Sequence, residues 1–157
     1  MRSLQRRGPQ APIRPDGADG RPVLLATLDV PFDHNAVVFA VDSAVELGQR
    51  LIIANFVERP PLPLSAMLGY DDLPYPPQMA EALLVPVKLA QSLGVEVTRL
   101  RVKSFHPVPA MLEVLAEQRA GIFVFGPDRS RIQRLRYARA ARAIRSRATS
   151  LVWLASD

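Results

Sequence analysis

The 157-residue sequence contains no cysteine. Without thiols it cannot form a disulfide framework, a thiolate zinc site, an iron–sulfur cluster or a cysteine nucleophile. Long apolar segments are absent too: the longest unbroken apolar run is residues 36–41, whereas a membrane span needs about 20 residues. The basic N-terminal residues are not followed by the apolar stretch of roughly 7–15 residues that a signal peptide requires. We therefore expect a cytoplasmic protein that makes no contact with a membrane.

Motifs of the common enzyme classes are also missing. His34 and His106 are the only imidazoles, and no pair of histidines or cluster of carboxylates has the spacing of metal ligands. The sequence has no Gly-x-Ser-x-Gly elbow, no P-loop and no Gly-x-Gly-x-x-Gly loop. The expectation is a protein with no catalytic residues and no metal site, and hence not an enzyme.

Charge is distributed unevenly along the chain, whose net charge is +5. Residues 1–21 carry +3, three prolines and three glycines, with almost no apolar side chains, which predicts a disordered basic tail. Residues 22–125 carry −4, and residues 126–148 carry +7 from eight arginines and one aspartate. The length beyond the tail suits a single domain over residues 22–157.

Hydrophobic patterning predicts alternating strands and helices. The expected strands are residues 23–28, 51–57, 95–102, 122–125 and 150–154, and the expected helices are residues 34–48, 78–93, 107–119 and 134–147. Such alternation implies parallel β-α-β units with right-handed crossovers. The predicted fold is an α/β domain: an open, doubly wound, five-stranded parallel sheet in the order 3-2-1-4-5, with helices on both faces.

Three segments carry more specific predictions. Asp33 is expected to cap the first helix and Gly48 to end it. Residues 58–77 contain six prolines, which predicts a long mobile loop that could act as a lid. In the helix 134–147 the predicted core-facing stripe is Leu135, Ala138, Ala141, Ile144 and Ala148, beside a solvated arginine face.

Ligands of open α/β sheets bind beyond the carboxyl ends of the strands, where the strand order reverses. If the first and fourth strands are central neighbours, the segments 27–29 and 125–129 meet at that point. The basic segment 126–148 begins there as well. This edge is therefore the predicted ligand site.

Three stretches carry a resemblance to a known family. They are the strand Leu24-Leu-Ala-Thr-Leu-Asp29, the segment Arg101-Val-Lys-Ser-Phe-His-Pro107 before a helix, and Phe123-Val-Phe-Gly126 with the arginine-rich block that ends at Leu154. In order and spacing they resemble the universal stress protein family over residues 22–155. The resemblance implies a regulatory or ligand-binding protein involved in the stress response.

Nucleotide-binding members of that family carry a G-x2-G-x9-G-[S/T] motif after the fourth strand. Glycines let the backbone approach phosphate, and helix N-terminal amides hold the anion. Gly126 matches the first position, but Arg129 occupies the second. The closing pair falls on Arg139 and Ala140, or on Tyr137 and Ala138 when aligned from the C-terminal block. The resemblance thus implies a degenerate pocket with no cofactor expected, and it carries over only Asp29 and Gly126.

Three hypotheses follow. The first is a non-enzymatic, universal stress protein-like binding or regulatory domain. In the second, Arg129, Arg131 and Arg134 replace the glycine loop and hold the phosphates of ATP or AMP by charge-assisted hydrogen bonds. The third is weak nucleic-acid association through the arginine-rich helix, which is disfavoured because Tyr137 is the only aromatic residue in the basic segment.

The segment Ser150–Leu154 is apolar and has no charge or proline to protect its backbone. In the order 3-2-1-4-5 it lies at a sheet edge, where an unpaired strand is an aggregation hazard. Family members commonly dimerise through their last strands, so the resemblance implies a homodimer formed by this edge. The alternative is that Trp153 packs entirely within one chain.

Overall fold

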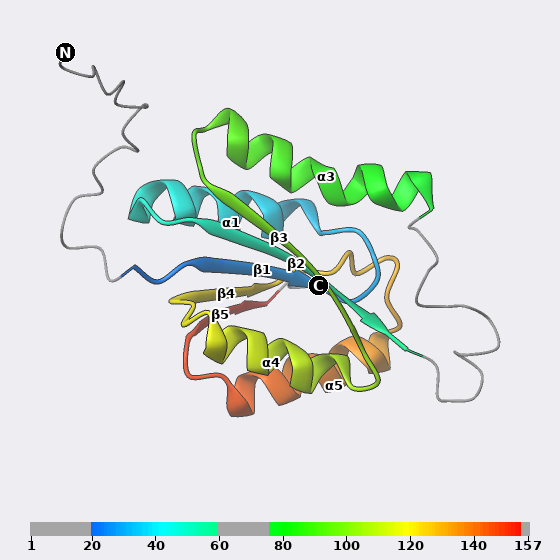
Figure 1. Cartoon of the computed structure of the whole chain (residues 1–157). Coiled ribbons are helices and arrows are strands. Elements are labelled where there is room, and N and C mark those ends of the chain that lie inside the picture. The colour runs from blue at the N-terminus through cyan, green and yellow to red at the C-terminus, as the bar shows by residue number, and fades with distance from the viewer. Residues whose placement is uncertain (1–19, 60–75, 155–157) are drawn as a thin grey trace, which may run out of the picture.

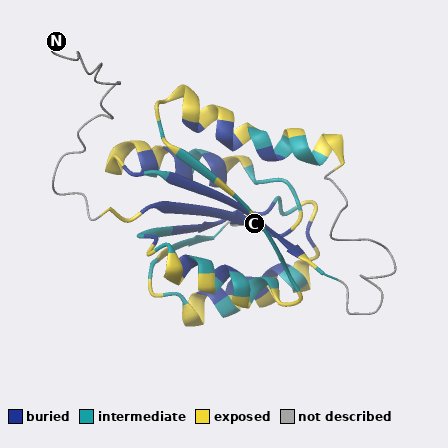
Figure 2. Cartoon of the chain, viewed as in Figure 1, coloured by how far each residue is buried: buried dark blue, intermediate teal, exposed yellow. Residues whose placement is uncertain are grey.

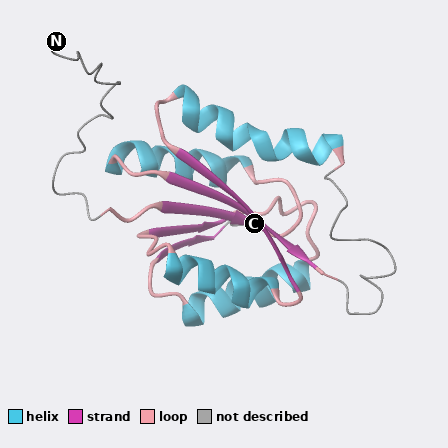
Figure 3. Cartoon of the chain, viewed as in Figure 1, coloured by secondary structure: helices cyan, strands magenta, loops and turns pink. Residues whose placement is uncertain are grey.

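A computed structural model describes residues 20–59 and 76–154 of the chain. The strands are β1 (Val23–Thr27), β2 (Leu51–Glu58), β3 (Val97–Ser104), β4 (Ile122–Phe125) and β5 (Leu151–Leu154). The helices are α1 (His34–Leu47), α3 (Pro77–Ser92), α4 (Pro107–Glu117) and α5 (Arg134–Arg147). Strands and helices alternate along the described chain (Figure 3), as the sequence pattern predicts.

The strands form one parallel sheet in the order β3-β2-β1-β4-β5. Helices α1 and α3 cover one face of the sheet, and α4 and α5 cover the other (Figure 1). The predicted fold class and strand order are therefore confirmed. β1 and β4 are central neighbours, so the strand order reverses between them.

The core lies on both faces of the central strands. β1 and most of β2 are fully buried (Figure 2) because helices cover both of their sides. Their continuous Val, Leu and Ile runs are typical of interior parallel strands. β3 lies at the sheet edge and is only partly buried, which agrees with its alternating sequence. The largest buried side chains include Phe56, Phe123 and Phe125.

Predicted helix ends at α1 are confirmed by their geometry. The Asp33 carboxylate accepts a hydrogen bond from the Ala36 backbone N–H at 3.0 Å, which satisfies one of the free amides of the first turn. Gly48 ends the helix in a left-handed conformation, with φ of 60°, and its N–H donates to a carbonyl of the last turn. In α3, Pro86 lies inside the helix and is buried.

The predicted core face of α5 is partly wrong. Tyr137, Ala140, Ala141 and Ile144 are buried, whereas Leu135 is 72% exposed and Ala138 is also exposed. The face is rotated because the ring of Tyr137 stacks on Phe125 at the end of β4, with centroids 5.6 Å apart. This aromatic contact turns the first turn of the helix so that Leu135 faces outward.

Several predictions concern segments outside the described residues. Of the predicted tail, only Gly20 and Arg21 are described, and residues 1–19 are not. Of the predicted loop 58–77, residues 60–75 lie outside the described ranges, while Glu58 ends β2 and Pro77 begins α3. Over the residues that the structure covers, none of the helices has the length and apolarity that a membrane crossing requires.

Candidate functional site at the carboxyl edge of the sheet

Parallel pairing places the ends of the strands side by side at one edge. Thr27 at the end of β1 pairs with Asn55 of β2, and Asn55 pairs with Arg101 of β3. On the other side of β1, Ala26 pairs with Phe125, so that Gly126 follows directly beside Thr27. The segments 27–29 and 125–129 therefore meet, as the sequence predicts.

Asp29 follows β1 in a left-handed backbone conformation, with φ of 50°. A non-glycine residue there is strained, although aspartate tolerates this region better than most residues. The side-chain oxygen of Asn55 accepts a hydrogen bond from the Asp29 N–H at 2.9 Å, and Asn55 itself is buried. The Thr27 hydroxyl donates to the Val30 carbonyl at 2.8 Å and closes the same turn.

The loops that follow β1 and β4 are joined by backbone hydrogen bonds. The Asp33 N–H donates to the Gly126 carbonyl at 2.9 Å, and the Asp128 N–H donates to the Pro31 carbonyl at 2.8 Å. Phe32 and Pro127 form an antiparallel bridge between the same loops. These contacts hold the two loops together beyond the ends of β1 and β4.

Gly126 has a structural reason of its own. A Cβ atom at this position would overlap the Cβ of Ala36 in the first turn of α1. Its φ is not in the left-handed region, so close approach of α1, rather than backbone conformation, requires glycine here. The residue that matches the first glycine of the family motif therefore serves helix packing.

The connection between β4 and α5 is short. It comprises residues 126–133, because β4 ends at Phe125 and α5 begins at Arg134. Both alignments of the closing glycine–hydroxyl pair, at 139–140 and at 137–138, fall inside α5. These positions are therefore helical and lie outside the loop that follows β4.

Arg129 and Arg131, the predicted pocket arginines, already have contacts within the chain. The guanidinium of Arg129 lies 3.6 Å from the centroid of the Tyr137 ring, which in turn stacks on Phe125. This is a cation–π arrangement. Arg131 forms an exposed ion pair with Asp128 at 3.6 Å, within the loop. Arg134 begins α5, whose N-terminus has no side-chain cap.

A hollow of about 510 Å³ opens on the α4 and α5 side of this edge. Its apolar part comprises Leu28, Pro107, Val108, Leu135, Ala140 and Ala143, and its polar part comprises Glu58, Gln133, Arg136 and Arg139. The volume is within the range of small-molecule sites, about 300–1,000 Å³. The arginines that line it are Arg136 and Arg139, and Arg129 and Arg131 are not among the lining residues.

Opposite charges meet around this hollow. Arg136 lies 3.6 Å from the carboxylate of Glu58 at the end of β2. Partial burial at the strand ends raises the pKa of Asp29 above its ordinary value, while the positive charges of Arg136 and Arg101 act in the opposite direction. Each of these two carboxylates therefore lies near at least one arginine.

In the part of the chain that the structure describes, no group of three or more histidines, aspartates or glutamates lies close enough together to hold a metal ion. His34 begins α1 and His106 precedes α4, and both are exposed. The hollow at the carboxyl edge offers an apolar floor with two arginines, Arg136 and Arg139, which suits the binding of a small anionic ligand.

Sequence reasoning missed Asn55, Glu58, Arg136 and Arg139. Asn55 could have been found, because an amide inside an apolar strand must find a hydrogen-bond partner. The roles of Arg136 and Arg139 depend on the rotation of α5, which the hydrophobic pattern misplaced.

No protein-family model matches the sequence, and no curated protein matches it. Solved structures do match. A universal stress protein family member from Burkholderia pseudomallei is 14% identical, with a TM-score of 0.63 over 88% of this chain and 97% of that one.

Two further matches have nucleotides bound. The universal stress protein from Archaeoglobus fulgidus in complex with dAMP is 16% identical, with a TM-score of 0.59 over 85% of this chain and 96% of that one. A universal stress protein family protein from Arabidopsis thaliana with AMP bound is 13% identical, with a TM-score of 0.55 over 85% and 89%. These likenesses, together with the sheet order, show that the chain has the fold of the universal stress proteins.

Proposed function

We propose that this chain is a divergent universal stress protein that acts by binding or regulation rather than by catalysis, and that its nucleotide pocket is degenerate. The observation that carries the proposal is the short connection of residues 126–133 between β4 and α5. It leaves no loop where the closing glycine and hydroxyl of the phosphate motif could lie. The role in the stress response that we propose follows from the resemblance, and the proposed cytoplasmic location follows from the sequence pattern.

A phosphate ligand remains the alternative, because relatives of the same fold bind dAMP and AMP. Arg136 and Arg139 line the 510 Å³ hollow and would meet such a ligand first. Arg129 and Arg131 would have to leave Tyr137 and Asp128 in order to take part, and Arg134 extends from the first turn of α5. The ion pair of Arg136 with Glu58 also competes with an added anion.

Calorimetric titration of the purified protein with Mg-ATP and with AMP tests this proposal. We expect no binding of Mg-ATP at micromolar affinity, because backbone amides cannot approach a phosphate chain where the motif glycines are missing. Micromolar or tighter affinity for Mg-ATP would contradict the degenerate pocket. In that case Asp29→Ala and Arg129→Ala should both weaken binding if the predicted pocket holds the nucleotide. Arg142→Gln, an exposed position elsewhere on α5, is the matched control.

We further propose a homodimer formed through β5. This strand lies at the sheet edge, and Leu151 is 67% exposed. The Leu151 N–H donates to the carbonyl of Gly121, the residue before β4, so by alternation the N–H of Val152 points away from the sheet. Trp153 stacks on Phe39 of the same chain with centroids 5.4 Å apart, so the dimer would use the outward-facing backbone rather than this ring.

The test of the dimer is Val152→Pro, which removes an outward-facing donor and leaves the pairing of β5 with β4 in place. In sedimentation velocity we expect the unmodified chain to run as a dimer and the variant as a monomer. Leu151→Lys, which places a charge on the exposed side of the same strand, should have a similar effect. A chain that is monomeric at tens of micromolar would contradict the proposal.

A further inference from the structure

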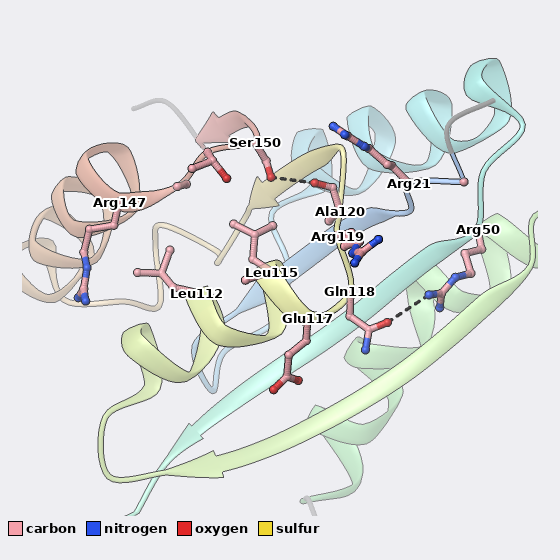
Figure 4. A pocket seen from close by; sticks show the side chains of 14 residues that line it. Arg21, Arg50, Leu112, Leu115, Glu117, Gln118, Arg119, Ala120, Arg147 and Ser150 are labelled. Carbon is pink, nitrogen blue, oxygen red and sulfur yellow. Dashed lines mark hydrogen bonds between the residues drawn. The ribbon is translucent and has the colours of Figure 1, made fainter. Parts of the chain in front are cut away.

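A larger hollow, of about 860 Å³, lies at the opposite edge of the sheet, where the strands begin (Figure 4). It is formed by the residues before β1 and β2, the C-terminal ends of α4 and α5, and the residues that lead into β5. We call it the amino-edge hollow. Its size is within the range of small-molecule sites. It shares no lining residue with the hollow at the carboxyl edge.

Positive charge dominates the amino-edge hollow. Arg21, Arg50, Arg119 and Arg147 line it, and among the lining residues Glu117 is the one carboxylate. The Arg50 guanidinium donates to the Thr98 hydroxyl at 3.4 Å and to the Gln118 side-chain oxygen at 3.1 Å. Both acceptors are uncharged, so they hold this guanidinium in position without neutralising it.

Arg119 occupies a position that ordinarily favours glycine. It follows the end of α4 in the left-handed conformation, with φ of 51°. The Arg119 N–H donates to the Ala116 carbonyl and the Ala120 N–H donates to the Leu115 carbonyl, which is the Schellman pattern of helix termination. The residue after the helix in this motif is usually glycine, and another residue there costs about 1–2 kcal/mol. The residue with this strained backbone has a charged side chain that lines the amino-edge hollow. This indicates a use for the charge.

The charges are separated by an apolar floor. Figure 4 shows Arg147 on one side of Leu112 and Leu115, with Arg119 and Arg50 on the other side. Ala116, Ala120 and Ala148 extend the floor. A ligand that contacts all of this surface therefore needs anionic groups at both ends and an uncharged body between them.

The N-terminal segment of the chain does not complement the amino-edge hollow in charge. Residues 1–19 carry four arginines and two aspartates, so their net charge has the same sign as that of the hollow. The complementary occupant is therefore an added anion. Guanidinium groups bind phosphate through paired, charge-assisted hydrogen bonds, which favours phosphate as the anionic group.

We propose that the amino-edge hollow binds a small organic bisphosphate, with its apolar body over Leu112 and Leu115 and one phosphate at each end. Arg147 binds one phosphate, and Arg119 with Arg50 binds the other. This site is separate from the carboxyl edge, so it stands whether or not a nucleotide binds there.

Calorimetry with simple probes tests the chemistry. A series of alkane-α,ω-diyl bisphosphates, from butane to decane, should bind with an optimum chain length and at least about tenfold more tightly than octyl phosphate, since one phosphate contact is lost in the monophosphate. Tripolyphosphate of matched charge should bind more weakly than the best bisphosphate. Equal affinity for tripolyphosphate would overturn the proposal, because charge alone would then account for binding.

Arg119→Gly provides the decisive variant. It should lower the affinity for the best bisphosphate about tenfold or more, while thermal stability stays equal or rises because glycine relieves the left-handed strain. Arg147→Gln should lower the affinity to a similar extent from the other end. Arg142→Gln removes the same charge from α5 outside the amino-edge hollow and should change the affinity less than about twofold.

Three further results would overturn the proposal. The first is a loss of stability in Arg119→Gly with unchanged affinity, which would assign the arginine to the helix end alone. The second is tighter binding of a single-stranded oligonucleotide with a steep salt dependence, which would make a nucleic acid the partner. Probe affinity that falls equally in Arg136→Gln and in Arg119→Gly would place the ligand at neither edge specifically and would also count against it.

Discussion

The arginines at the two edges of the sheet differ in how many carboxylates lie beside them. At the carboxyl edge, Arg136 is paired with Glu58. The positive charges of Arg136 and Arg101 also act to lower the pKa of Asp29. At the amino edge, four arginines share a hollow with a single lining carboxylate. At the carboxyl edge the two carboxylates lie beside arginines, whereas the arginines that line the amino-edge hollow outnumber its carboxylate four to one.

The two edges also differ in how backbone conformation relates to the residue that is present. At the carboxyl edge Gly126 is required by the close approach of α1, although its conformation suits any residue. At the amino edge Arg119 adopts a conformation that suits glycine, although another residue is present. Packing therefore determines the residue at Gly126, whereas Arg119 is present despite the strain of its backbone conformation.

The largest expected effect is that of Gly126→Ala. Its new methyl group would overlap the Cβ of Ala36, so α1 must shift from the sheet, and we expect a loss of about 1–3 kcal/mol in the free energy of unfolding. Urea denaturation followed by circular dichroism measures it. The matched change at the other edge, Arg119→Gly, should give no loss.

A double-mutant cycle sharpens this test. Ala36→Gly alone should cost about 1 kcal/mol from helix propensity. Combined with Gly126→Ala it should recover part of the loss, because the overlapping methyl group is gone. Purely additive costs would show that the contact between these two positions is not the reason for glycine at 126.

Most of the fold could be predicted from the sequence because its signals are local. Continuous apolar runs identified β1 and β2, and Asp33 and Gly48 marked the ends of α1. The rotation of α5 could not be predicted in this way. It depends on the stacking of Tyr137 against Phe125, a contact between residues of different elements that no helical periodicity reports.

A smaller loss is expected at the turn after β1. Asn55→Ala removes the acceptor of the Asp29 N–H in a buried setting, which should cost about 1–3 kcal/mol, toward the lower end because the turn lies near solvent. Chemical denaturation measures the loss. Asp29→Gly in the same background should recover part of it, because glycine adopts the left-handed conformation without support. No recovery would mean that Asn55 acts through packing alone.

The site was only partly predictable. The meeting of segments 27–29 and 125–129 follows from the strand order. Which arginines line the hollow does not follow, because it depends on how α5 is turned about its axis. Both alignments of the last motif positions already fall inside the helix predicted over residues 134–147, and α5 has the same bounds. The amino-edge hollow joins residues from the starts and ends of five elements, and no spacing in the sequence brings them together.

The smallest expected effect is the pH dependence of Asp29. Its pKa is raised in the folded state by desolvation, so between the ordinary carboxyl value of 3.8 and the raised value the folded chain binds more protons than the unfolded chain. This contribution to stability therefore falls as the pH rises through that window. Asparagine tolerates the same backbone conformation but does not ionise, so Asp29→Asn should remove this fall in stability.

Relative to the unmodified chain, the free energy of unfolding of Asp29→Asn should accordingly be larger at pH 7 than at pH 3, which means a more stable variant at pH 7. Arg136→Gln removes a charge that lowers this pKa, so the same difference should widen in its background. Denaturation curves at the two pH values measure both quantities. An Asp29→Asn chain that is less stable than the unmodified chain at pH 7 would mean that the attraction of Arg136 and Arg101 outweighs desolvation. The ionised carboxylate of Asp29 would then stabilise the folded chain through its attraction to these two arginines.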